Sequence, residues 1–319
     1  MFNLMNKNVL VTGGVGFIGG HLVEELIKRK VNITVVDINL DKKSYLFTKN
    51  LHKKAKVIKL DICNYQKLTN LIKRYKIDFI FHLAAQSLVG EGYKNPKYTL
   101  ENNILGTINI LEATRNNPKI KGLVVASSDK CYGKLNKKQY IETDPLSGDH
   151  PYNTSKSATD LISTTYYATY KTPVIVTRFG NIYGEGDLNY SRIIPGIMKS
   201  IITDKILEIR SNGKFIRDYL YVKDVVAGYL LLAQNIEKAK GQAYNFGSND
   251  TLSVLEVIQT VGQSLKQKIN YKILNTAINE IPYQSLNYSK IKKEFGWKPK
   301  ENMQQTIKNI LSWYKESLL

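Results

Sequence analysis

"VTGGVGFIGGHL", residues 11–22, joins the end of a short apolar strand to the start of a helix. Gly13, Gly16 and Gly19 follow the strand and open the helix, which carries Leu22 and Leu26. Glycine permits a tight turn and the close approach of a pyrophosphate, whose charge then meets the exposed N–H groups at the helix start. Alone, such a glycine pattern is a weak signal, so the rest of the chain decides its meaning.

The next strand supplies the context that the glycines need. Residues 33–37, "ITVVD", end in Asp37, at about the right distance along the chain to bind a ribose 2′-hydroxyl. A carboxylate there would repel a 2′-phosphate, so the pattern predicts NAD rather than NADP, although Lys42 and Lys43 nearby keep NADP open. The alternative, in which Asp37 only caps a helix in a plain turn, is disfavoured by the combined pattern.

Short apolar runs alternate with helix-length segments through the first half of the chain. The runs are residues 8–13, 33–38, 56–61, 79–85, 123–129 and 174–180. This alternation predicts an α/β fold with a doubly wound, Rossmann-type parallel sheet. Beyond residue 180 the alternation loosens, with helices expected near 192–203 and 302–317. We therefore predict an NAD-binding domain over 1–180, with return segments near 219–246, and a smaller α/β lobe over 181–319.

Composition excludes several classes of function. The 319 residues, 43% of them hydrophobic, can bury one large core or two modest ones. The formal charge of +19 comes from lysine pairs spread along the chain, without a nucleic-acid-binding signature. Neither a membrane-spanning run nor a signal peptide is present, so we expect a cytoplasmic protein. Cys63 and Cys131 lie far apart without a CxxC or His-rich segment, so we predict neither a disulfide nor a metal site.

A second motif is "HPYNTSKSATD", residues 150–160, which places Tyr152 and Lys156 one helical turn apart on the same face. A cationic Lys156 near the phenol would lower the pKa of Tyr152 and let it act as a base, while also reaching a nicotinamide ribose. A Tyr and a Lys at this spacing are usually an ordinary surface pair. The dinucleotide motif is what favours the catalytic interpretation here.

A third motif is "LVVASSDKCYG", residues 123–133, in which a buried strand runs directly into Ser128, Asp129 and Lys130. All three side chains can move protons. The alternative is a surface ion pair in a loop, which would contribute little. The position of the three residues directly after a strand argues against that alternative.

Together these motifs resemble the extended short-chain dehydrogenase/reductase family over nearly the whole chain. Further stretches that carry the resemblance are "FHLAAQSLV", "ENNILGTINILEA", "RFGNIYGEGD", "RDYLYVKDV", "YNFGS" and "SKIKKEFGW". The resemblance implies that the first lobe binds NAD and that the second closes over a nucleoside diphosphate sugar. The implied cofactor-binding residues are Gly13, Gly16, Phe17, Ile18, Asp37, Asp61, Ile62, Ala84, Ala85, Asn103, Tyr152 and Lys156.

The resemblance also implies positions within the cofactor site. Asp61 is expected near the adenine, and Asn103 is expected to order the active site. Ala84 and Ala85 are expected near the phosphates and the nicotinamide ribose.

The residues after the fifth strand distinguish branches of this family. A sugar 4-epimerase usually has Ser or Thr followed by small residues, whereas the dTDP-glucose 4,6-dehydratases carry Asp-Glu. "SSDKCYG" looks most like the CDP-glucose 4,6-dehydratases, which carry Asp-Lys. The implied activity is nucleotide-sugar 4,6-dehydration, with CDP-glucose as the expected substrate. The chain is shorter than those enzymes, and "IRDYLYVKDV" is closer to the stretch found in dTDP- and UDP-sugar enzymes. The nucleotide base of the substrate therefore stays open.

The implied mechanism is a closed redox cycle. Tyr152 takes the O4 proton, Ser128 shares its hydrogen bond, and the C4 hydride passes to NAD and later to C6. Lys130 is the candidate base for the C5 hydrogen, and Asp129, protonated, is the candidate acid for the departing C6 hydroxyl. Lys156 completes the implied catalytic set.

The resemblance assigns the nucleotide sugar to Ser87, Ser128, Asn181, Arg192 and Arg217. A guanidinium can hold phosphate oxygens through two parallel hydrogen bonds. The alternative for Arg217 is an ion pair with Asp218 or Asp224.

Two other functions stay open at this stage. A related 4-epimerase would use Tyr152 and Ser128 without needing Asp129 or Lys130. A non-catalytic protein that senses NAD would not need the catalytic side chains that this chain retains. The resemblance further implies a homodimer, formed by the helix that carries Tyr152 and the one near residues 97–115.

Overall fold

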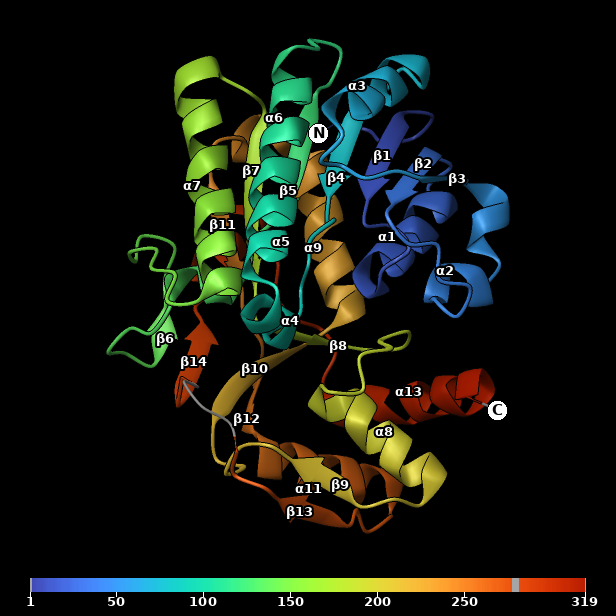
Figure 1. Ribbon diagram of the computed structural model, residues 1–319, viewed down its shortest axis with the longest axis vertical. Helices are drawn as coiled ribbons and strands as arrows, with labels where there is room; N and C mark the ends of the chain where they lie inside the picture. Colours follow the sequence, from blue (N-terminus) through green and yellow to red (C-terminus); the bar gives the residue numbers. More distant parts are fainter. Residues whose placement is uncertain (1, 277–280, 319) are drawn as a thin grey trace.

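A parallel sheet organises the first lobe. The computed structural model describes residues 2–276 and 281–318 (Figure 1). Seven strands pair in the order β11-β7-β5-β4-β1-β2-β3. Their bounds are β1 Asn8–Thr12, β2 Asn32–Asp37, β3 Lys56–Lys59, β4 Phe79–His82, β5 Gly122–Ala126, β7 Val174–Phe179 and β11 Ala243–Phe246. All six predicted strands are present, and the predicted α/β Rossmann-type fold is confirmed.

Helices cover both faces of this sheet. The helices of the first lobe are α1 Phe17–Lys28, α2 Tyr45–Thr48, α3 Tyr65–Arg74, α4 Val89–Lys94, α5 Pro96–Leu100, α6 Gly106–Arg115, α7 Pro151–Tyr170, α9 Val222–Gln234 and α10 Ile236–Ala239. One apolar core joins α3 and α6 to the sheet, and another joins α1 and α9 to it. In Figure 1, α6 and α7 stand side by side in front of the strands, and α9 crosses behind them.

The second lobe lies beyond the carboxyl ends of the parallel strands (Figure 1). Its five-stranded sheet contains β6 Gln139–Tyr140, β8 Asn181–Tyr183, β10 Ile216–Tyr221, β12 Asp250–Ser253 and β14 Tyr283–Leu286, and β9 Leu207–Ile209 pairs separately with β13 Tyr271–Ile273. Its larger helices are α8 Ile193–Thr203, α11 Val254–Leu265 and α13 Met303–Leu318. The short α12 spans Ser289–Phe295. The helices expected near 192–203 and 302–317 are thus confirmed as α8 and α13.

The chain passes between the two lobes more than once. The strand β11 pairs with β7 at the edge of the parallel sheet, although β10 before it and β12 after it belong to the second lobe. The helix α9 packs on the sheet between these crossings. The short strand β6, from the first half of the chain, pairs with β14 of the second lobe.

A buried ion pair ties the strand β7 to the helix α7. Nε of Arg178 donates to Asp160 at 2.7 Å, and a terminal nitrogen donates to the other carboxylate oxygen at 2.8 Å. The guanidinium also donates to the hydroxyl of Tyr132 at 2.6 Å. Because Tyr132 belongs to the 3₁₀ turn that follows β5, this network holds α7 against that turn. The two segments with the predicted catalytic residues are therefore joined.

Within residues 2–276 and 281–318, no helix combines the length and apolar character needed to cross a bilayer.

Candidate active site

The glycine loop packs so closely against neighbouring backbone that a Cβ would clash at Gly13 and Gly19. Gly13 has a φ of +69°, and a Cβ there would lie 2.7 Å from the backbone nitrogen of Ala84. A Cβ on Gly19 would lie 2.3 Å from the carbonyl oxygen of Gly13. Gly16 precedes α1 without providing a side-chain cap, so the first N–H groups of that helix face the loop. This glycine cradle at a helix start fits a pyrophosphate.

Asp37 lies beside the glycine loop. One carboxylate oxygen accepts the N–H of Val15 at 3.1 Å, and the other accepts that of Asn39 at 3.3 Å. Burial raises the pKa of Asp37, while these backbone hydrogen bonds lower it. Phe17 and Ile18, the first residues of α1, are half-buried and pack against the core under the loop.

The other predicted cofactor residues follow β3 and β4. Asp61 is exposed, and Ile62 beside it is buried, with its carbonyl accepting the Asn109 amide at 2.9 Å. Ala84 and Ala85 are half-buried, and the N–H of Ala84 donates to Thr12 at 3.2 Å. Both pairs lie at the carboxyl edge of the sheet, as the glycine loop does.

Asn103 connects the loop after β4 to the helix α7. It lies in a π-helical turn, Glu101–Leu105, and is 2% exposed. Its side chain accepts the N–H of Gln86 at 2.7 Å and donates to the carbonyl of the same residue at 3.0 Å. It also donates to the hydroxyl of Ser155 at 2.9 Å. Asn103 therefore fixes the loop, in which Ser87 is exposed, relative to the helix that carries Tyr152.

Ser128, Asp129 and Lys130 form a connected group directly after β5. The hydroxyl of Ser128 donates to Asp129 at 2.9 Å and accepts the N–H of Lys130 at 3.2 Å. The ammonium of Lys130 lies 3.0 Å from the second carboxylate oxygen of Asp129. The side chain of Asp129 is 5% exposed and that of Lys130 is 19% exposed. The pair is thus largely withdrawn from solvent, in contrast to the surface ion pair considered from the sequence.

Tyr152 and Lys156 are both buried on α7. Burial raises the pKa of Tyr152 to about 12, although a hydrogen bond with Ser128 acts in the opposite direction. Burial lowers the pKa of Lys156 to about 8, and its ammonium donates to the carbonyl of Ala126 at 2.8 Å. The expectation that the pKa of Tyr152 is lowered is therefore wrong for this structure, because burial of the phenol outweighs the stabilising contacts.

The predicted substrate residues lie on the second lobe or next to it. Asn181 starts β8, which pairs with β10. Arg192 directly precedes α8 and pairs with Asp187 at 3.1 Å. Arg217 lies on β10 and donates to the carbonyl of Ile216 at 2.8 Å.

The carboxylates proposed as alternative partners of Arg217 have structural roles. Asp218 accepts the hydroxyl of Thr251 and the N–H of Leu286, both at 2.7 Å. Asp224 accepts the N–H groups of Lys300 and Glu301, both at 3.0 Å. The contacts of Asp218 stabilise the sheet of the second lobe, and those of Asp224 join α9 to the segment before α13.

Sequence reasoning missed three residues that order the site. Gln86 and Ser155 hold Asn103, and Gln284 from β14 contacts both Asp129 and Lys130. Gln86 belongs to "FHLAAQSLV" and Ser155 to "HPYNTSKSATD", but neither is assigned a role from the sequence, and Gln284 lies outside every quoted motif. The pairing of β14 with β10, which brings Gln284 to the site, has no local sequence signal.

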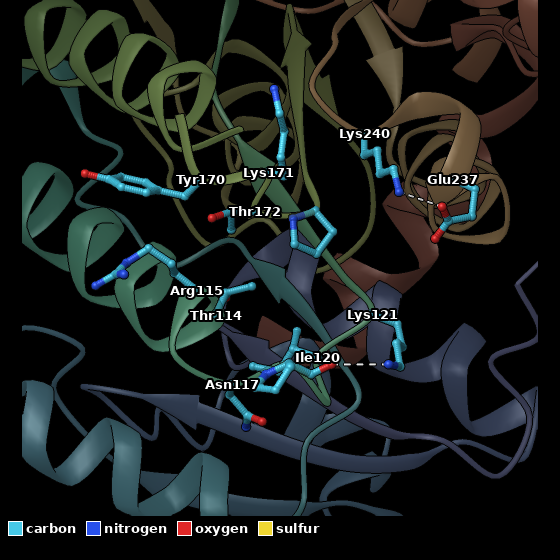
Figure 2. A pocket seen from close by; sticks show the side chains of 12 residues that line it. Thr114, Arg115, Asn117, Ile120, Lys121, Tyr170, Lys171, Thr172, Glu237 and Lys240 are labelled. Carbon is cyan, nitrogen blue, oxygen red and sulfur yellow. Dashed lines mark hydrogen bonds and ion pairs between the residues drawn. The ribbon is translucent and has the colours of Figure 1, made fainter. Parts of the chain in front are cut away.

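A pocket of about 320 Å³ opens at the other end of the parallel sheet, where β5 and β7 begin (Figure 2). Its basic side chains are held by the chain itself. Lys240 pairs with Glu237 at 2.6 Å, and Lys121 donates to the carbonyl of Pro118 at 3.2 Å. The residues with proton-transfer chemistry lie at the opposite, carboxyl edge, and we place the active site there.

Comparison with known proteins gives the class and then the family. A solved dTDP-glucose 4,6-dehydratase from Bacillus anthracis, in complex with NAD, is 29% identical, covers 97% of both chains and has a TM-score of 0.84. The protein is therefore an NAD-dependent enzyme with a Rossmann-type fold. The family described as GDP-mannose 4,6 dehydratase matches residues 10–310, and the chain belongs to this family.

Two further proteins show the range of similarity. The dTDP-glucose 4,6-dehydratase of Haemophilus influenzae is 31% identical over 336 residues, covering 96% of this chain and 97% of its own. A UDP-glucose 4-epimerase from Thermotoga maritima, solved with UDP-glucose, is 25% identical, with a TM-score of 0.88 and 98% of this chain covered. The predicted family, NAD as the cofactor and the class of NAD-dependent nucleotide-sugar 4,6-dehydratase are confirmed.

Proposed function

We propose that the protein converts a nucleoside diphosphate hexose to its 4-keto-6-deoxy derivative with the loss of one water. The observation that carries this proposal is the hydrogen-bonded pair of Asp129 and Lys130 directly after β5. Epimerisation at C4 needs acid–base chemistry only at O4, which Tyr152 and Ser128 can supply. Elimination across C5 and C6 needs a further base and a further acid.

The first step is assigned to Tyr152, which takes the O4 proton while the hydroxyl of Ser128 shares its hydrogen bond. When bound, NAD would supply reversible hydride transfer, from C4 and later to C6, so that no external oxidant would be consumed. Lys156 contributes a buried cationic group close to the end of β5. Its ammonium donates to the carbonyl of Ala126 at 2.8 Å, which holds the charge beside the segment that carries Ser128.

The elimination is assigned to the Asp129–Lys130 pair. Transfer of one proton from the ammonium to the carboxylate, across a 3.0 Å hydrogen bond, produces a neutral amine and a carboxylic acid. These are the two forms that the reaction requires. The amine of Lys130 then takes the C5 proton, and Asp129 protonates the C6 hydroxyl as it departs as water. A proton later returns to C5 when hydride returns to C6.

The cofactor residues receive proposed roles at the carboxyl edge of the sheet. We assign the pyrophosphate to the loop with Gly13 and Gly16, and the adenosine ribose to Asp37, close to Phe17 and Ile18. Asp61 and Ile62 are assigned to the adenine, and Ala84 and Ala85 to the nicotinamide side. The division into an NAD-binding domain over 1–180 and a nucleotide-sugar lobe over 181–319 stays a prediction.

The nucleotide sugar is assigned to the space between the lobes, with Arg192 and Arg217 as the diphosphate ligands and Ser87 and Asn181 as further contacts. CDP-glucose is the substrate predicted from the Asp-Lys pair. The dehydratase relatives described above act on dTDP-glucose by name, which favours dTDP-glucose instead. We therefore propose these two substrates, and the experiment below decides between them.

We also propose a homodimer formed through α6 and α7, which pack side by side. Leu161 on α7 is 55% exposed, and Leu105 immediately before α6 is 42% exposed. The homodimer would cover these two leucines. Sedimentation of the wild-type protein beside Leu161→Glu tests the dimer, which the substitution is expected to dissociate. A cytoplasmic location stays a prediction.

The experiment that tests the function is incubation of the purified protein and NAD with CDP-, dTDP-, UDP- and GDP-hexoses, followed by mass spectrometry. Loss of one water from the sugars of one nucleotide series supports the dehydratase and identifies the nucleotide base of its substrate. Unchanged mass with an inverted sugar configuration would instead establish the 4-epimerase, which the likeness to the Thermotoga enzyme keeps as second candidate. No conversion of any sugar would favour a protein that only binds NAD.

A further inference from the structure

Gln284 joins the second lobe to the two residues that follow β5. It lies on β14 and is 1% exposed, and both ends of its amide have partners. Its Oε1 accepts a hydrogen bond from Nζ of Lys130, and its Nε2 donates to the backbone oxygen of Asp129 at 2.9 Å. An ammonium only donates and a carbonyl only accepts, so these two partners fix the orientation of the amide.

The strand that carries Gln284 is itself held in place. β14 pairs in parallel with β10, and the register sets Gln284 opposite Arg217. The buried carboxylate of Asp218, the next residue on β10, accepts the N–H of Leu286 on β14 at 2.7 Å. The proposed diphosphate ligand Arg217 and the residue that contacts Lys130 are therefore neighbours on two bonded strands.

We propose that Gln284 is a positioning residue for the elimination step, holding the side chain of Lys130 and the backbone of Asp129 where they exchange protons with C5 and C6. The inference rests on the proposed 4,6-dehydration. A lysine side chain is long and flexible, so a buried acceptor for Nζ restricts it to one geometry. Through the pairing of β14 with β10, the same residue connects that geometry to the strand proposed to bind the diphosphate.

This role predicts that a substitution of Gln284 affects the release of water but not the oxidation at C4. Oxidation at C4 uses Tyr152 and Ser128, and no hydrogen bond described for Gln284 reaches either of them. Loss of the amide should therefore slow the release of water without slowing the reduction of NAD. A purely structural role would lower stability and slow both halves together.

The test uses Gln284→Met, which keeps the length of the side chain and removes both hydrogen bonds. The matched control is Gln139→Met on β6, an exposed glutamine whose neighbour in the register is Ser285 of β14. Single-turnover absorbance measures reduction of the cofactor, and mass spectrometry measures loss of water. We expect about 10- to 100-fold slower water loss in Gln284→Met, with wild-type rates of cofactor reduction. The Gln139→Met control should match the wild type in both.

A second variant keeps the proposal testable if Gln284→Met does not fold. Gln284→Glu keeps the acceptor for Lys130 and adds a negative charge, which favours the ammonium form of that lysine. The pH at which water loss is fastest should therefore move upward, while cofactor reduction keeps its wild-type pH profile. Water loss at the wild-type rate in Gln284→Met, or an unmoved pH profile in Gln284→Glu, would overturn the positioning role.

The two proposals fail in different ways. A wild-type protein that releases no water from any nucleotide sugar would refute the dehydration on which the inference depends. A wild-type protein that releases water, together with a Gln284→Met variant that does so equally fast, would refute only the role of Gln284.

Discussion

The ammonium of Lys130 lies 3.0 Å from a carboxylate oxygen of Asp129, and both side chains are largely withdrawn from solvent. The hydroxyl of Ser128 holds the other carboxylate oxygen at 2.9 Å. The proposed elimination accounts for two ionisable residues in the turn that follows the buried strand β5. A proton that moves along the Asp129–Lys130 hydrogen bond creates a base and an acid side by side, as an elimination requires.

The glycine loop gives a prediction about cofactor binding. Gly19→Ala places a methyl group 2.3 Å from the carbonyl oxygen of Gly13, so the backbone of the loop must move. Strain of this kind costs about 1–3 kcal/mol, and we expect affinity for NAD to fall at least about tenfold. Titration calorimetry with NAD measures the loss.

The control for Gly19→Ala is Gly90→Ala in α4, where an added Cβ meets no heavy atom within 4 Å. Alanine is also the better helix former. This variant should bind NAD as the wild type does and should not be less stable. Unchanged affinity in Gly19→Ala would contradict the role of the loop.

The buried ion pair between Asp160 and Arg178 gives a prediction about stability. Asp160→Ala leaves the guanidinium buried without its two carboxylate contacts at 2.7 and 2.8 Å. Loss of one member of a buried pair lowers the free energy of unfolding by about 3–5 kcal/mol. Urea unfolding followed by circular dichroism measures this change.

The exposed pair of Glu237 and Lys240 provides the comparison, because the side chain of Glu237 is 79% exposed. Glu237→Ala should leave the unfolding curve within experimental scatter of the wild type. Equal effects of the two substitutions on the free energy of unfolding would contradict a special contribution from the buried Asp160–Arg178 pair.

Asp218 gives a prediction about pH. Burial raises its pKa from 3.8 to about 6, so the folded protein binds this proton more tightly than the unfolded chain does. Its contribution to stability is therefore present at low pH and is lost as the pH rises from about 4 to about 6, by roughly 2–3 kcal/mol. Asp218→Asn keeps an oxygen for the N–H of Leu286 and removes the titration.

Urea unfolding of wild type and Asp218→Asn at several pH values tests this assignment. The stability of the wild type relative to the variant should fall across that pH interval. A difference that does not change with pH would contradict the raised pKa.

The parallel sheet and the cofactor loop could be predicted because their signals are local. Each of the six predicted runs is a short apolar stretch, and the turn after β1 needs glycine wherever the backbones approach closely. The carboxyl ends of parallel strands meet at one edge of the sheet. The strand assignments alone therefore predict that Gly13, Asp37 and Ser128 lie at the same edge.

Other features of the site depend on contacts between distant segments. Gln284 reaches Lys130 across 154 positions, through a strand pairing that has no local pattern. The π-helical turn that carries Asn103 is likewise invisible in its residue types. The spacing of Tyr152 and Lys156 places them on one face, but the degree of burial that raises the tyrosine pKa comes from the surrounding fold.

The most direct test of the account is Lys130→Met, studied with the nucleotide sugar that the wild-type protein dehydrates. Cofactor reduction is expected at a rate close to that of the wild type, because Tyr152 and Ser128 remain. Water loss is expected to slow by about 100- to 10,000-fold, so the C4-oxidised sugar and reduced cofactor accumulate. Water loss at the wild-type rate in Lys130→Met would contradict the assignment of the elimination to the Asp129–Lys130 pair.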